Sequence, residues 1–190
     1  PRDASRINRC RMWQGRAAAP LLAGLPMSAR AQQVPNAKVN TTKRAVTETE
    51  VTVGQMQSST GTMAISETGS IQAEQLAIDQ INAMGGVLGR KIKVIKEDGA
   101  SDWPTFAEKS KKLLVNDRVA AVFGCWTSAS RKAVLPIFEK ENGMLYYPTF
   151  YEGLEPSKIV IYTGQEATQQ ILYGLDWAAK EKKAKTFFLV

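Results

Sequence analysis

Residues 120–138 read AAVFGCWTSASRKAVLPIF and join a short apolar run to an amphipathic stretch. The run 120–123 is bounded by Gly124 and has the length and composition of a central parallel strand buried on both faces. The stretch 130–141 then repeats apolar residues at helical spacing. A strand followed at once by a helix is the unit of parallel sheets. This stretch therefore predicts an α/β fold, and Pro136 predicts that its helix is bent or shortened.

The same alternation of strand and helix patterns extends from Glu50 to the last residue. Further strands are predicted at 51–56, 91–97, 144–147, 159–163 and 186–190, and further helices at 69–84, from 103 onward and at 167–183. The helix at 69–84 ends at Gly85-Gly86, and its predicted core face carries Ala73, Leu76, Ala77, Ile81 and Met84. The alternation predicts a doubly wound parallel sheet of the Rossmann-like class.

Four segments are distinguished along the chain. Residues 1–31 combine early arginines with a small apolar run and Ala29-Arg30-Ala31, which is typical of a signal peptide, although a disordered basic leader has a similar composition. Residues 32–49 are predicted to be a disordered linker, and residues 50–165 a ligand-binding lobe. Residues 166–190 are predicted to start a second lobe that is incomplete, because nothing covers the final apolar strand. We therefore expect the N-terminal part of an exported protein, periplasmic or extracellular.

The basic charge of the chain lies almost wholly in its first part. The formal net charge is +7, of which residues 1–46 carry +8 and residues 47–190 carry −1. A nucleic-acid-binding protein needs its basic groups clustered on the folded domain, so this distribution argues against such a partner. The sequence also has no apolar run of the roughly 20 residues that span a bilayer, which argues against membrane insertion.

Three loops follow predicted strands at the edge of the sheet where open parallel sheets bind their ligands. They cover residues 58–62, 124–128 and 147–151 and are rich in hydroxyl groups and aromatic rings but poor in charge. This chemistry favours a small, planar, neutral polar ligand, whose carbonyl group we expect to point at the helix that begins at Ser128. Ordinary helix capping by Ser128 and ordinary packing of the aromatic residues remain alternatives. The candidate ligand-binding residues are Thr60, Gly61, Trp126, Ser128, Tyr147, Thr149, Phe150 and Tyr151.

Catalysis has little support in the sequence. The chain has no histidine, so neither a Ser-His triad nor a metal site with histidine ligands can form within it. Cys125 follows an apolar strand and is interpreted as a buried, inert thiol. Asp98 and Asp102 are interpreted as turn and capping residues. We expect a protein that is not an enzyme and that needs no cofactor.

Two long stretches resemble urea-binding proteins of bacterial ABC transporters: residues 97–108, EDGASDWPTFAE, and residues 122–136, VFGCWTSASRKAVLP. Shorter stretches add to the likeness, namely residues 59–66 and 85–90, the pair Tyr147-Pro148, and Tyr151-Glu152-Gly153. The resemblance runs from about Val51 to the end of the chain. It identifies the chain as similar to type 1 periplasmic binding proteins and to the cytoplasmic amide sensor that regulates an aliphatic amidase.

This resemblance implies two α/β lobes joined by crossing strands, with urea or a short-chain amide held in the cleft between them. The ligand contacts of the amide sensor carry over to Ser128, Tyr147 and Thr149, and to Trp126, where the sensor has tyrosine. Phe150 departs from the pattern, since the sensor has proline there and urea binders often have glutamine. The implied partners are the permease and ATPase subunits of an ABC importer. The alternatives are a cytoplasmic amide sensor, a binding protein of the branched-chain amino acid type, and an amide hydrolase.

Overall fold

A computed structural model describes residues 42–188 of the chain. Its centre is an all-parallel sheet of five strands in the order β2-β1-β3-β4-β5. This order confirms the predicted α/β fold with a doubly wound parallel sheet. The strands are β1 (Glu50–Gln57), β2 (Lys91–Asp98), β3 (Val122–Gly124), β4 (Leu145–Tyr147) and β5 (Val160–Tyr162).

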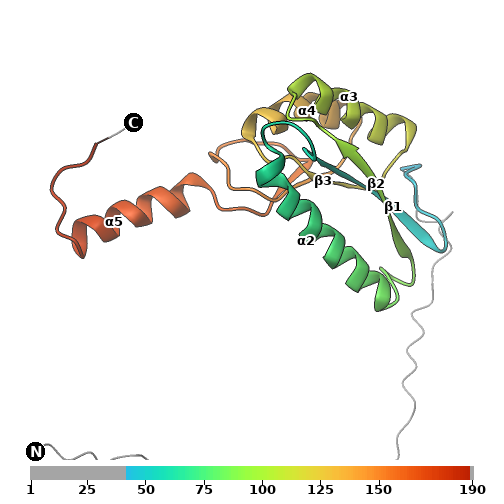
Figure 1. Cartoon of the computed structure of the whole chain (residues 1–190), viewed down its shortest axis with the longest axis horizontal. Coiled ribbons are helices and arrows are strands. Elements are labelled where there is room, and N and C mark those ends of the chain that lie inside the picture. Colours follow the sequence, from blue (N-terminus) through green and yellow to red (C-terminus); the bar gives the residue numbers. More distant parts are fainter. Residues whose placement is uncertain (1–41, 189–190) are drawn as a thin grey trace, which may run out of the picture. The chain divides into compact units, whose positions relative to one another are not determined.

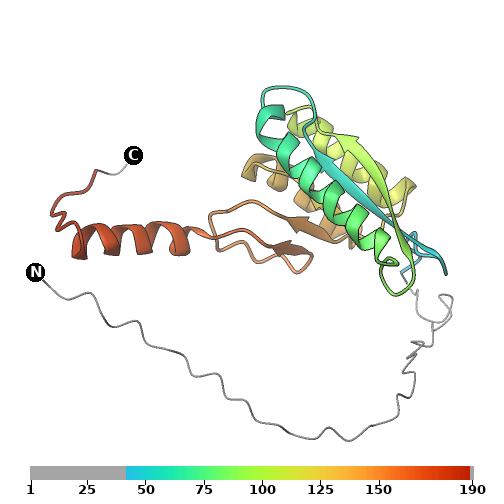
Figure 2. The same cartoon turned by 60° about the horizontal axis from the view of Figure 1, so that its bottom comes forward.

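Helices cover both faces of this sheet. Helix α2 (Ala64–Ala83) lies along one face, and α3 (Trp103–Lys111) and α4 (Ser128–Lys140) lie on the other (Figure 1 and Figure 2). Helix α3 continues into a π-helical turn, η1 (Lys112–Asn116). The chain leaves β1 toward β2 through α2 and returns past β1 to β3 through α3. The direction of winding therefore changes between β1 and β3, and this is the point where open α/β sheets form their ligand crevice.

The hydrophobic core lies between the sheet and the pair α3 and α4. Val122 points into it, while its neighbour Phe123 points to the opposite face and stacks on Tyr146 at 4.9 Å between ring centroids. This alternation is the period of two expected of a strand. The fully buried apolar side chains of the core are Met56, Phe106, Leu113, Val119, Val122, Val134, Phe138 and Leu145.

The predicted helix signals near the sheet are confirmed. The Asp102 carboxylate caps α3 and accepts a hydrogen bond from the backbone N–H of Thr105 at 2.9 Å. Gly86 adopts a φ of +82° at the end of α2, and its N–H donates to the Ile81 carbonyl at 2.8 Å. The first contact pairs an N–H group at the start of α3, and the second pairs a carbonyl group at the end of α2. Neither group has a partner within its own helix.

The predicted core face of α2 is only partly confirmed, because Ala77 and Ile81 face the sheet across a cavity of about 490 Å³ whereas other predicted residues do not. The helix begins at Ala64 instead of residue 69, and Leu76 and Met84 are 60% and 80% exposed. The face toward the sheet carries Ile78 and two carboxylates, Glu67 and Glu74. The physical reason is that polar groups of the sheet lie beneath the first half of the helix. The amides of Gln55 and Gln57 both donate to Glu74, and the Ser58 N–H donates to Glu67.

Helix α4 runs through Pro136 from residue 128 to residue 140. The shortening that Pro136 predicted as one possibility does not occur. Its buried face carries Val134 and Phe138, which lie in the core. Core packing of these side chains offsets the cost of about 3 kcal/mol that a proline imposes inside a helix.

The segment 42–49, predicted to be part of a disordered linker, contacts the lobe. The Arg44 guanidinium donates to the backbone carbonyls of Leu114 at 3.2 Å, Glu141 at 2.6 Å and Asn142 at 3.0 Å. These carbonyls stand at or near the ends of η1 and α4, where a cation is favoured by the helix dipole. Residues 32–41, and the predicted signal peptide at 1–31, lie outside the described residues.

The last part of the described chain contains a π-helical turn, η2 (Thr168–Leu172), and helix α5 (Tyr173–Lys180), where one helix was predicted. None of their residues is buried. Over residues 186–188 the predicted strand does not form, and residues 189 and 190 lie outside the described part. A strand needs a neighbour to pair its N–H and C=O groups, and no described strand lies beside this segment. Within residues 42–188 we find no helix with both the length and the apolar character needed to cross a membrane.

Gly124 gives the first testable prediction, because it ends β3 with a φ of +151° and a Cβ there would overlap the Met56 carbonyl of β1. We expect Gly124→Ala to lower the free energy of unfolding by about 2 to 5 kcal/mol. Gly69→Ala in α2 is the matched control, since a Cβ there meets nothing within 4 Å. It should raise stability by about 0.5 to 1 kcal/mol. Thermal unfolding followed by circular dichroism measures both, and equal melting temperatures for the two variants would contradict the prediction.

Candidate ligand-binding site

The ends of β3 and β4 and the start of α4 build the candidate site. Strands β3 and β4 deliver Trp126 and Tyr147 to the carboxyl edge of the sheet, and α4 begins there at Ser128. A cavity of about 210 Å³ lies against this helix start. Three of the predicted ligand-binding residues line it together, and the full lining is Ser128, Phe150, Tyr151, Glu152, Ala167, Gln170 and Ile171.

The first turn of α4 presents backbone donors to this edge. Thr127 caps the helix, and its hydroxyl accepts from the Ser130 N–H at 3.0 Å. The first backbone bond of the helix runs from the Arg131 N–H to the Thr127 carbonyl at 3.1 Å. The N–H groups of Ser128 and Ala129 therefore precede the intrahelical bonds, and together with the helix dipole they favour an oxygen of a ligand. Capping itself is performed by Thr127 and not by Ser128.

Arg131 is the central side chain of the site and is fully buried. Its guanidinium donates to Glu155 at 3.0 and 3.2 Å, to Glu152 at 3.0 Å and to the Ser128 hydroxyl at 3.2 Å. It also lies 4.7 Å from the ring centroid of Tyr147, within cation–π distance. A buried charge is tolerated only when its donors are paired. The pairing here links α4, the end of β4 and the loop 151–155.

The two carboxylates around Arg131 remain ionised. Hydrogen bonding from Ser128, together with Arg131, lowers the pKa of Glu152 to about 2. Burial opposes the charge of Glu155, but hydrogen bonds from Arg131 and Tyr162 outweigh it and lower its pKa. For Arg131, burial likewise opposes the charge, and the bonds to Glu155 and Glu152 raise the pKa above its usual value. All three groups are charged throughout the physiological range.

Trp126, Tyr147 and Thr149, which were also predicted to bind the ligand, do not line this cavity. The Tyr147 hydroxyl donates to the Trp126 carbonyl at 2.7 Å, and the ring is buried, which raises the pKa of the phenol. Thr149 is 8% exposed, and its Oγ1 has no hydrogen-bond partner among the described residues. A buried hydroxyl without a partner is costly, so Thr149 has hydrogen-bonding capacity left for another group. Trp126 is half-buried.

Thr60 and Gly61 lie in a different cluster. The Thr60 hydroxyl donates to the Asp98 carboxylate at 2.7 Å, and Asp98 also accepts from the N–H groups of Ser59 and Ala100. Burial opposes this charge, but the hydrogen bonds, led by Thr60, lower the pKa of Asp98 to about 2. Asp98 thus joins the loops after β1 and β2, as its interpretation as a turn residue predicted. Neither Thr60 nor Gly61 lines the cavity at Ser128.

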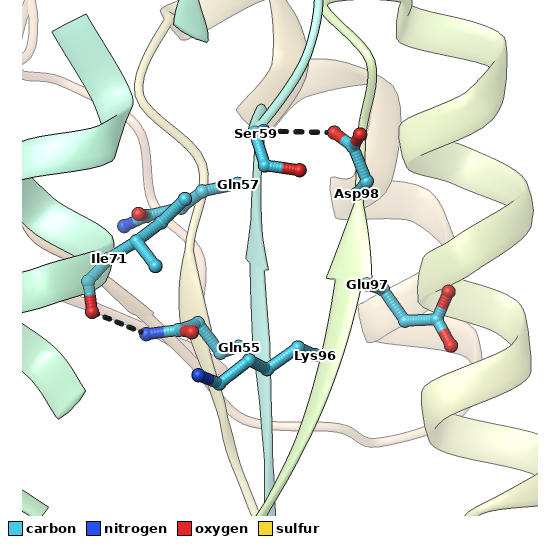
Figure 3. A pocket seen from close by; sticks show the side chains of 7 residues that line it. All are labelled: Gln55, Gln57, Ser59, Ile71, Lys96, Glu97 and Asp98. Carbon is cyan, nitrogen blue, oxygen red and sulfur yellow. Dashed lines mark hydrogen bonds between the residues drawn. The ribbon is translucent and has the colours of Figure 1, made fainter.

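A second cavity of about 170 Å³ lies between α2 and the ends of β1 and β2, lined by Gln55, Gln57, Ser59, Ile71, Lys96, Glu97 and Asp98. Figure 3 shows Gln55 and Gln57 on the side of α2, while Glu97 points away toward α3. There Glu97 pairs with Lys109 at 3.2 Å and with Lys112. The Gln55 amide donates to the Ile71 carbonyl at 3.2 Å and to Glu74 at 2.7 Å. These contacts hold α2 on the sheet, and no predicted ligand-binding residue lines this cavity.

Sequence reasoning missed Arg131, Glu152 and Glu155. A signal for Arg131 was present, because it follows Ser128 by three residues and precedes Val134 by three. That spacing puts it on the buried face of α4, where an arginine needs carboxylate partners. The partners come from a loop without periodicity, so their identity was not visible in the sequence.

Cys125 gives the second prediction. Its side chain is fully buried at the end of β3, and burial raises the pKa of the thiol to about 12. Because the thiolate is the reactive form, we expect native protein to resist iodoacetamide at pH 8 and to react at Cys125 after denaturation. Peptide mass spectrometry measures the modified fraction. Rapid alkylation of Cys125 in the native state would contradict the buried position.

Comparison with known proteins places the chain in a family. The sequence profile described as "Periplasmic binding protein domain" matches residues 51–190, which is most of the chain. The chain belongs to the periplasmic binding protein family. The five strands of this binding protein, and the α/β lobe they form, all lie within the matched residues except for the first residue of β1.

Relatives of this periplasmic binding protein include the Leu/Ile/Val-binding protein of Escherichia coli strain K12, which is 37% identical over 76 residues. That match covers 40% of this chain and 20% of the relative. A Leu/Ile/Val-binding protein homolog of Brucella melitensis is 29% identical over 98 residues, covering 47% of this chain and 24% of the relative. The chain thus spans about a quarter or less of the length of these curated relatives.

Two solved structures show the same fold. One is the substrate-binding protein LivJ of a branched-chain amino acid transporter from Streptococcus pneumoniae, in complex with isoleucine, with a TM-score of 0.64 and 25% identity. That match covers 72% of this chain and 40% of LivJ. The other is a fatty acid ABC transporter substrate-binding protein from Thermomonospora curvata, with a TM-score of 0.65 and 24% identity, covering 75% of this chain and 36% of that one.

Proposed function

We propose that this protein is the extracytoplasmic solute-binding component of an ABC importer and that it captures urea or a short-chain amide. Membership of the periplasmic binding protein family supports the binding role and the permease and ATPase partners. The observation that supports the ligand class is the combination of groups at the start of α4. Backbone N–H groups of Ser128 and Ala129 that precede the intrahelical bonds stand there beside an acceptor carboxylate, Glu152, which lines the same cavity as Ser128.

A urea or amide molecule matches this set of groups. Its carbonyl oxygen would accept from the N–H groups of Ser128 and Ala129, and its NH₂ groups would donate to oxygens of the site. The aromatic rings of Phe150 and Tyr151 line the same cavity and would exclude water from the planar ligand. In this proposal Tyr147 supports the site through its cation–π contact with Arg131, and Trp126 through the hydrogen bond that its carbonyl accepts from the Tyr147 hydroxyl. Thr60 and Gly61 lie outside this cavity, near Asp98. A second lobe would complete the enclosure.

A branched-chain amino acid is the second candidate ligand, because curated relatives are named Leu/Ile/Val-binding proteins and LivJ was solved with isoleucine. An amide hydrolase is a weaker candidate, since the cysteine near the site is buried with a raised pKa. A cytoplasmic amide sensor would share the fold and would lack export.

Calorimetric titration of the full-length protein with urea, acetamide, formamide and leucine tests the ligand class. We expect saturable binding of urea or one of the amides, and no steady release of ammonia during incubation with them. Tight binding of leucine with no response to the other three would overturn the proposed ligand. Sustained ammonia release would overturn the binding role itself.

Ser128→Ala gives a sharper test at the site. The substitution removes a hydroxyl from the cavity wall and from the Arg131 network, and we expect the affinity for urea or the amide to fall by about 1 to 3 kcal/mol. Titration calorimetry of the full-length variant measures the change, and Lys111→Ala on the exposed surface of α3 is the control. An unchanged affinity in Ser128→Ala would remove Ser128 from the binding site.

A further inference from the structure

We infer that Glu152 determines ligand specificity. Its carboxylate accepts hydrogen bonds from the N–H groups of a ligand, and it repels a ligand that carries a carboxylate but no N–H donor. The inference rests on the proposed function, whose ligand it narrows to a chemical class. That class is small polar molecules with N–H groups and without an unpaired negative charge.

The helix start alone cannot make this choice. The N–H groups of Ser128 and Ala129, with the dipole of α4, favour any oxygen that carries partial or full negative charge. An anionic carboxylate would satisfy them at least as well as a neutral amide carbonyl. Selectivity for neutral ligands therefore needs a second group in the cavity that binds an amide more favourably than a carboxylate.

Glu152 is placed to be that group. It lines the same cavity as Ser128 and Tyr151, and its side chain is 61% exposed although one oxygen pairs with Arg131 at 3.0 Å. The exposed part of the carboxylate can accept hydrogen bonds from a molecule in the cavity. Glu155, the other partner of Arg131, is 15% exposed and does not line this cavity.

The buried network around Arg131 carries one excess negative charge, and Lys132 is the nearby cation outside it that also acts on Glu155. Arg131 supplies one positive charge, and Glu152 and Glu155 supply two negative charges. The Tyr162 hydroxyl adds a hydrogen bond to Glu155 without adding charge. Because the pKa of Glu152 is about 2, the excess negative charge persists at every physiological pH. A second carboxylate placed in this cavity would meet like charge at short range, which weakens its binding.

The Ser128 hydroxyl adds to the acceptor character of the wall. It accepts a hydrogen bond from the Arg131 Nη1 at 3.2 Å. A hydroxyl has two lone pairs, so Ser128 keeps one acceptor site for a ligand. The cavity thus offers backbone donors on one side and side-chain acceptors on the other. Amides and urea carry both kinds of group, whereas a simple carboxylate carries acceptors alone.

The test compares acetamide with acetate, two ligands of nearly the same shape that differ in charge and in N–H groups. Titration calorimetry of the full-length protein should show that wild type binds acetamide more tightly than acetate. In Glu152→Gln we expect the ratio of the acetate Kd to the acetamide Kd to fall by about tenfold or more. Glu152→Asp keeps the charge and should retain the preference. Glu108→Gln removes a carboxylate from the exposed surface of α3 and should leave the ratio unchanged.

The outcomes separate this inference from the proposed function. Wild-type binding of amides with an unchanged ratio in Glu152→Gln overturns the inference and leaves the function standing. Wild-type preference for acetate, or binding of neither ligand class, overturns both. If leucine proves to be the ligand, the function fails, and the role of Glu152 is decided with leucine and 4-methylpentanoate, which lacks the ammonium group. An unchanged ratio for that pair in Glu152→Gln then overturns the inference as well.

Discussion

The buried guanidinium of Arg131 is the constraint on which the geometry of the site depends. It joins three parts of the chain that have no backbone hydrogen bonds to one another: the first turn of α4, the ring of Tyr147 at the end of β4, and the carboxylates of the loop before β5. Removing a charge of this kind from water costs several kcal/mol, which pairing with a carboxylate and hydrogen bonding offset. The loop is therefore held in one position, and the wall of the cavity with it.

The sheet supplies the second part of the framework. Parallel pairing of β1 with both β2 and β3 brings the loops after these strands to one edge, and Gly124 lets β3 end in close contact with Met56. The loops then separate into two clusters with different chemistry. On the β2 side, the Asp98 carboxylate accepts hydrogen bonds from hydroxyl and N–H donors. On the β4 side, the Arg131 guanidinium donates hydrogen bonds to carboxylates. Between them the start of α4 faces the crevice.

Most of the fold was predictable from the sequence, because buried strands and amphipathic helices leave periodic patterns that do not depend on distant partners. The exceptions are the sheet-facing side of α2 and the charged partners of Arg131. The core face of α2 was partly misassigned because Glu67 and Glu74 make polar contacts with the sheet, and hydrophobic periodicity does not reveal such contacts. In the site, the placement of Ser128, Phe150 and Tyr151 around one cavity followed from their positions after neighbouring strands. The charged partners of Arg131 depend on the conformation of an irregular loop, which no local pattern encodes.

Two carboxylates, Glu152 and Glu155, pair with the guanidinium of Arg131, and they have different roles. Glu155 lies deep and keeps Arg131 neutralised, whereas Glu152 stands at the surface of the cavity. Loss of the outer acid would leave no uncompensated cation inside the protein. The position is therefore open to substitution during evolution at little cost to folding, so related proteins with the same scaffold can diverge in the charge of the solutes they accept by exchanging a single outer residue.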